Sequence, residues 1–103
     1  METKNFLSDK MQYLKEYCEK YQVKTMYVFG SVLTPNFSQT SDVDVLISFK
    51  NIPIETYTDN YFNLHTDLEQ LFNRSVDLLT ENSLKNPFFI QSIEQNKQLI
   101  YAS

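Results

Sequence analysis

The chain has 103 residues, 42% hydrophobic and 15% aromatic, and this composition excludes an intrinsically disordered protein. The net charge is −4 and the lysines are scattered singly, so a grip on long nucleic acid is not expected. The single cysteine excludes an intrachain disulfide. Because no signal peptide and no apolar run of about 18 residues is visible, we expect a soluble cytoplasmic protein with one domain, residues 1–103.

The first predicted element is a helix over residues 5–21. Its apolar residues recur at spacings of four, three, four and three, which makes one stripe along a helix. They are Leu7, Met11, Leu14, Cys18 and Tyr21. Because Cys18 lies on this stripe, we expect a buried core residue and not a reactive thiol.

Three strands follow, at "KTMYVFG" (24–30), "DVDVLISF" (42–49) and "SVDLLT" (75–80). Helical periodicity marks residues 57–72, with His65 at the rim of that helix, and a further helix is expected from Pro87. A short extended tail, "QLIY", ends the pattern. This order predicts an α/β (α+β) fold, a small mixed sheet flanked by helices.

Asp42 and Asp44 place two acids on one face of a strand, because side chains alternate along it. A divalent cation would compensate the two charges, and oxygen ligands favour Mg²⁺ or Mn²⁺. The alternative to a metal site is structural: Asp42 would close a turn, and Asp44 would be an acid at the rim of a strand edge. An EF-hand is excluded because its sixth and twelfth positions hold Ile47 and Pro53. A haloacid-dehalogenase-like phosphotransferase also uses D-x-D at a strand end, but it needs a larger chain and further basic residues.

Gly30 is the only glycine, and Ser31 follows it directly. A strand ending in Gly-Ser offers backbone N–H groups and a hydroxyl to a phosphate, with no Cβ at the glycine to hinder approach. A plain turn is the alternative. Asp77 is the one acid within the third strand, and its convergence with Asp42 and Asp44 would give the three carboxylates of two-metal phosphoryl or nucleotidyl transfer.

Taken together, Gly30-Ser31, ten residues, then Asp42-Val43-Asp44, with Asp77 downstream, resemble the minimal nucleotidyltransferases of the DNA-polymerase-β-like superfamily. The resemblance implies a palm-like core and transfer of AMP from ATP. It also implies nucleotide contacts at Gly30 and Ser31, and two Mg²⁺ ions (or Mn²⁺) on Asp42, Asp44 and Asp77, the last also acting as the base. Such proteins commonly pair with a HEPN-domain RNase toxin, and some attach AMP to a toxin tyrosine.

One departure from this family is the stretch "VLTPNFSQ" (32–39), which has neither the arginine nor the second glycine that many members carry there. Without that arginine, the rate of catalysis is expected to be lower. Two other functions therefore stay open. One is a binding module that blocks a partner through exposed aromatics, with Tyr57, Tyr61, Phe62, Phe88 and Phe89 as candidates. The other is a transferase acting on a small molecule or an RNA end.

Overall fold

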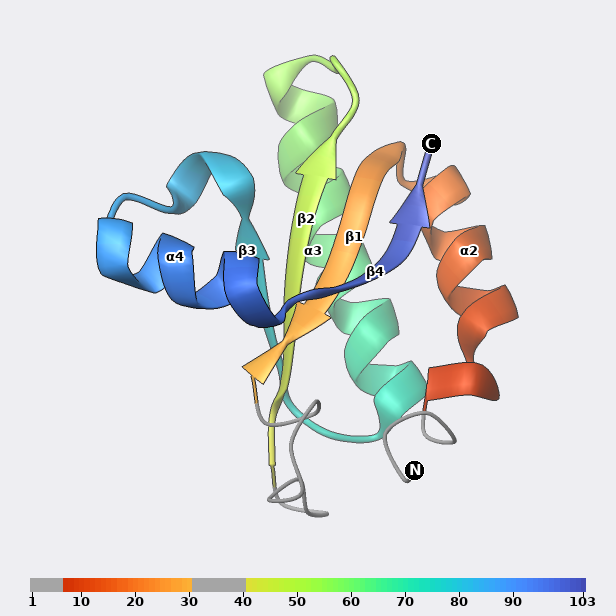
Figure 1. Ribbon diagram of the computed structural model, residues 1–103. Helices are drawn as coiled ribbons and strands as arrows, with labels where there is room; N and C mark the ends of the chain where they lie inside the picture. The colour runs from red at the N-terminus through yellow and green to blue at the C-terminus, as the bar shows by residue number, and fades with distance from the viewer. Residues whose placement is uncertain (1–6, 31–40) are drawn as a thin grey trace.

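The computed structural model describes residues 7–30 and 41–103, in which four strands form one sheet in the order β3-β2-β1-β4 (Figure 1). Central β1 (Val23–Phe29) runs antiparallel to β2 (Val43–Phe49) and to β4 (Gln98–Ala102). The edge strand β3 (Val76–Thr80) runs parallel to β2. The predicted α+β class with a mixed sheet is confirmed.

Two helices cover one face of the sheet and bury the main core. Helix α2 (Met11–Lys20) packs on β1 and β4, and α3 (Ile54–Phe72) packs on β3. The buried residues of this layer come from both helices and from alternate positions of the strands. Among them are Leu14, Cys18, Leu64, Leu68, Val28, Val43, Val45 and Ile47. The expected inward face of β2 is therefore confirmed.

Helix α4 (Pro87–Asn96) lies on the opposite face, over a smaller cluster formed by Phe29, Leu46 and Ile93 (Figure 1). Asn86 caps this helix, because its side-chain oxygen accepts the backbone N–H groups of Phe88 and Phe89. Pro87 follows at the first helical position, where its missing N–H costs nothing. The predicted start of this helix at Pro87 is confirmed.

The C-terminal tail differs from the prediction, because it joins the sheet as β4 and does not remain a separate extended segment. It pairs with the outer edge of β1, where Met26 faces Tyr101 and Thr25 faces Ala102. This pairing satisfies backbone groups that would otherwise lie along an open strand edge. A short 3₁₀ turn, η2 (Glu81–Ser83), follows β3 and was not expected either.

Helix α3 begins at Ile54, three residues earlier than predicted. The helix ends at Asn73, whose φ of 54° is left-handed, as is common at a helix C-terminus. In the described part of the chain, no helix is long and apolar enough to cross a membrane.

The thiol of Cys18 is fully buried, with Sγ 3.9 Å from the sulfur of Met26. Burial raises its pKa to about 12. We therefore expect no reaction of the folded protein with Ellman's reagent at pH 8 over an hour. The same protein in guanidinium chloride is the control and should react with one equivalent at once. Fast labelling under native conditions would contradict the predicted core position.

Candidate active site

The candidate site lies where β1 ends and β2 and β3 run side by side, on the face that α4 covers. Asp44 and Asp77 are register partners on the parallel strands β2 and β3. Neighbouring parallel strands are about 4.8 Å apart, so the two carboxylates start from adjacent positions on the sheet. The sequence-predicted pairing of Asp44 with Asp77 is therefore present in the fold.

Asp42 stands one residue before β2 and is exposed to solvent, whereas Asp44 is half-buried and Asp77 is exposed. Burial is the main cause that raises the pKa of Asp44, to about 6, and repulsion from Asp77 and then from Asp42 adds to it. Asp42 and Asp77 thus both act electrostatically on Asp44 at this end of the sheet.

Gly30 follows β1 directly and has a φ of +76°, which is left-handed. A Cβ built on Gly30 would stand 2.1 Å from Oδ2 of Asp44, which is too close for two non-bonded atoms. The glycine is therefore needed twice, for its backbone angle and for the room it leaves to the carboxylate. Ser31, the other predicted nucleotide contact, lies outside the described residues.

Within residues 7–30 and 41–103, no three Asp, Glu, His or Cys side chains stand together as a ready metal centre. The donors nevertheless fit Mg²⁺ or Mn²⁺, because they are all carboxylates and their mutual repulsion would be relieved by a cation. Mg²⁺ in nucleotide enzymes is commonly held by one or two carboxylates together with phosphate oxygens of the substrate. The described carboxylates can therefore supply part of such a coordination shell, with phosphate oxygens completing it.

Arg74, the only arginine of the chain, was not singled out by the sequence reasoning. Its Nη1 donates to the carbonyl oxygen of Ser41 at 3.1 Å. The backbone of Val43 also donates to the carbonyl of Ser75, at 3.0 Å. These two bonds tie the start of β2 to the loop before β3, and so position Asp42. Two distant segments make this contact, which no local pattern reveals.

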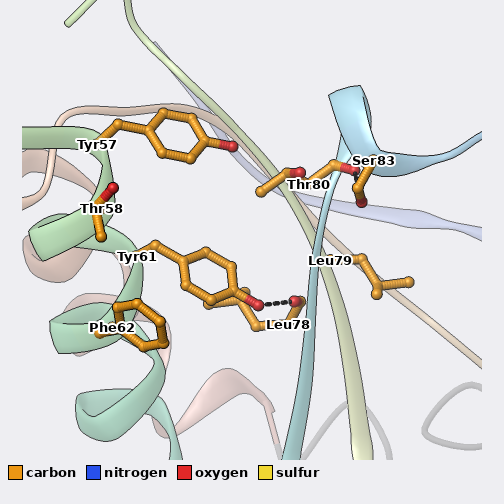
Figure 2. A pocket seen from close by; sticks show the side chains of 8 residues that line it. All are labelled: Tyr57, Thr58, Tyr61, Phe62, Leu78, Leu79, Thr80 and Ser83. Carbon is orange, nitrogen blue, oxygen red and sulfur yellow. Dashed lines mark hydrogen bonds between the residues drawn. The ribbon is translucent and has the colours of Figure 1, made fainter. Parts of the chain in front are cut away.

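A cavity of about 330 Å³ lies between α3 and the outer edge of β3, and Figure 2 shows the side chains that line it. The hydroxyl of Tyr61 donates to the carbonyl oxygen of Leu78 at 2.5 Å. His65 Nε2 lies 2.9 Å from the carbonyl oxygen of Val76. Side chains of α3 thus satisfy outward carbonyls of the edge strand, and the expected rim position of His65 is confirmed.

Three of the aromatics considered as interface candidates are exposed, and two are not. The exposed fractions are 62% for Phe62, 81% for Phe88 and 42% for Phe89. Tyr57 and Tyr61 are half-buried between α3 and the sheet. Of the candidates for a partner surface, the three phenylalanines are therefore the ones that solvent reaches.

Comparison with known proteins identifies the family to which the chain belongs. Residues 12–103 match the model of the family described as polymerase beta, nucleotidyltransferase. The chain therefore belongs to the polymerase β nucleotidyltransferase family, and it is a nucleotidyltransferase. Enzymes of this family generally use divalent metal ions.

Two relatives illustrate how far the likeness extends. MJ0126 of Methanocaldococcus jannaschii, provisionally named a protein adenylyltransferase, is 40% identical over 87 residues, which are 84% of each chain. The protein adenylyltransferase MntA of Thermococcus cleftensis is 36% identical over 72 residues, which are 70% of each chain.

Solved structures share the fold at low identity. A toxin–antitoxin complex crystallised with AMP-PNP contains a chain that matches with a TM-score of 0.69 at 14% identity, over 90% of this chain and 73% of that one. A Shewanella oneidensis complex of a tri-AMPylated HEPN toxin with an MNT antitoxin matches with a TM-score of 0.64 at 14% identity, over 93% and 72%. These likenesses bear out the predicted polymerase-β-like palm core.

Replacing Asp44 by Asn should stabilise the metal-free protein by about 1 kcal/mol, a reduced figure because the carboxyl is partly solvated. Between its ordinary pKa of 3.8 and its folded value of about 6, the folded chain holds more proton at this site than the unfolded chain. The unfolding free energy contributed here therefore falls as pH rises through that window. Urea titrations at pH 4, 5 and 6 should show this fall in the wild type and a smaller one in the variant. An equal change of unfolding free energy with pH in the wild type and the variant would contradict this prediction.

Replacing Gly30 by Ala should cost about 1–2 kcal/mol through the left-handed backbone alone, and should also displace the Asp44 carboxylate. We expect a loss of about 10²-fold in transfer activity, because a shift near 1 Å suffices for that. Asn73→Ala is the matched control, because it also places alanine at a left-handed position, with a φ of 54°. It should lower the melting temperature without the activity loss. Full activity in Gly30→Ala would refute the close packing.

Proposed function

We propose that this chain transfers AMP from ATP to a tyrosine of a HEPN-domain partner and so acts as the antitoxin of a toxin–antitoxin pair. We further propose that residues 1–103 form a single nucleotidyltransferase domain. The observation that carries the proposal is the register pairing of Asp44 with Asp77 beside the glycine that ends β1.

In this proposal Asp42, Asp44 and Asp77 are the metal ligands and the catalytic residues, and Gly30 and Ser31 contact the triphosphate. Two Mg²⁺ ions, or Mn²⁺ in their place, would activate the attacking hydroxyl and neutralise charge on the triphosphate and on the departing pyrophosphate. The half-buried position of Asp44 strengthens its interaction with a cation, because the local dielectric is low.

The reaction balances as one in-line displacement at phosphorus. The tyrosine oxygen of the acceptor forms a bond to the α-phosphorus, and the bond from that phosphorus to the bridging oxygen of the β-phosphate breaks. Pyrophosphate leaves with the electron pair of the broken bond. Asp77, which is exposed at the open edge of the site, accepts the phenol proton as general base.

The choice of acceptor is supported by the named relatives and by size. The relatives carry the name protein adenylyltransferase, and one fold neighbour was solved with an AMPylated HEPN toxin. A chain of 103 residues has little surface left to hold an acceptor beside a nucleotide, so the acceptor brings its own binding surface. We propose that the reaction takes place in the cytoplasm, where an RNase partner would meet its RNA.

The proposal is tested with ATP labelled at the α- or at the γ-phosphate, incubated with the protein, Mg²⁺ and a lysate of the native host. We expect one protein band labelled from the α-position only, and no label in the presence of excess EDTA. The variant Asp42→Asn/Asp44→Asn should lose the label by at least about 10³-fold, as expected for removal of metal ligands. Label from the γ-position, or an active double variant, would overturn the assignment.

A charge-matched control separates the site from a general charge effect. Asp9→Asn/Asp59→Asn removes the same two charges at exposed positions outside the site, and it should transfer AMP like the wild type. Loss of activity in this control as well would remove the support for a specific role of Asp42 and Asp44.

A second candidate function is neutralisation of the partner by occlusion alone, and the exposed Phe62 and Phe88 favour it. Expression of Asp42→Asn/Asp44→Asn together with the partner toxin in cells distinguishes the two functions. Survival of these cells at the wild-type level supports occlusion. Toxicity restored by the double variant, with the complex still formed, supports transfer.

A further inference from the structure

A cavity of about 600 Å³ lies beneath α4 and reaches Asp44. Phe29, Gly30 and Asp44 line it from the sheet. Helix α4 supplies the opposite wall with Phe89, Ser92, Ile93, Gln95 and Asn96. This volume lies within the usual range for small-molecule and cofactor sites. The cavity therefore has room for more of a nucleotide than its phosphates.

The aromatic side of this wall is Phe89. Its ring meets that of Phe29 edge to face, with 6.2 Å between the centroids and 74° between the planes. Phe29 is buried in the small cluster beneath α4, so this contact helps to hold the Phe89 ring in place. Phe89 still remains 42% exposed, which leaves ring surface open to a planar group. Stacking of a base on such a ring favours binding, because every base offers a flat aromatic face.

The polar side of the wall carries amides and a hydroxyl but no charge. Nδ2 of Asn96 donates to the carbonyl oxygen of Ser92 at 2.9 Å. This bond turns the amide nitrogen toward the helix and leaves Oδ1 as the atom directed away from it. A fixed acceptor favours a base that presents an exocyclic amine over one that presents a carbonyl there. Adenine carries such an amine at N6, whereas guanine carries a carbonyl at the corresponding position.

We propose that the inner wall of α4 is the base-binding site for the nucleotide, with Phe89 stacking on adenine and Asn96 accepting from its amino group. The inference rests on the proposed nucleotide transfer and assigns the substrate specificity of that same site. Phe89 and Asn96 are seven residues apart, two helical turns, so both lie on one face of α4. Neither belongs to the Gly-Ser and carboxylate set.

The test measures binding calorimetrically, with α,β-methylene-ATP as a nucleotide that cannot be cleaved at the reacting bond, and with tripolyphosphate as the same anion without a base. Both are titrated with Mg²⁺ present. Phe89→Ala should weaken the nucleotide about tenfold, which corresponds to 1.4 kcal/mol of stacking, and leave tripolyphosphate unchanged. The neighbouring Phe88→Ala is the matched control, because Phe88 is 81% exposed and does not line the cavity. It should change neither affinity.

Asn96→Leu tests the choice of base. The wild type should prefer α,β-methylene-ATP over its guanosine counterpart, and the variant should bind the two within about twofold, because the discriminating acceptor is gone. Circular dichroism and melting temperatures confirm that each variant is folded. A wild type that binds both bases equally would overturn the role of Asn96.

Two outcomes would overturn the base site as a whole. One is nucleotide binding by the wild type no tighter than that of tripolyphosphate, and the other is an equal loss in Phe88→Ala and Phe89→Ala. Failure of the transfer proposal looks different. Nucleotide binding that depends on Phe89, without any AMP transfer, would sink the transfer reaction and support the base site. AMP transfer with unaltered nucleotide affinity in Phe89→Ala would support the transfer reaction and overturn the base site.

Discussion

The parallel pairing of β2 with β3 is the constraint on which the candidate site depends. A shift of this register by one residue would move Asp77 away from Asp44 and reverse the face on which every β3 side chain lies. Val76 and Leu78 are buried against the helices, so any such shift would expose them. The hydrophobic core therefore fixes the register, and the register places the carboxylates beside each other. Packing on one face of the sheet determines the chemistry on the other.

The same arrangement stores electrostatic repulsion in the protein. Three acids lie at one end of the sheet, and the pKa of Asp44 is raised by burial, by Asp77 and by Asp42. Nothing in the folding of the chain benefits from this, because apolar or amide side chains at Asp44 would pack without the penalty. A repulsive cluster beside a glycine that a Cβ would block is therefore better explained by a ligand that carries positive charge than by stability.

Much of this could be predicted from the sequence, because the signals are local. The apolar stripes of α2 and α3, the alternation in β2 and the Asn86-Pro87 start of α4 depend on neighbouring residues only. Two features could not be predicted in this way. The pairing of β4 with β1 joins residues that are seventy or more positions apart in the chain, and the α4 wall depends on which face of the sheet that helix covers. Phe89 was a candidate for a protein interface, whereas its place beside Gly30 and Asp44 appears only in three dimensions.

The absence of an arginine after Gly30-Ser31 can be considered in the same physical terms. Such an arginine would add affinity for the triphosphate, and the only arginine here, Arg74, is engaged with the backbone of Ser41 at the start of β2. Affinity lost at the phosphates can be offset by contacts to another part of the same nucleotide, because binding free energy from remote groups also contributes to holding the reacting centre. A base held between the α4 wall and the sheet would supply such contacts. Base contacts in the cavity beneath α4 would therefore offset the lack of a basic residue after Gly30-Ser31.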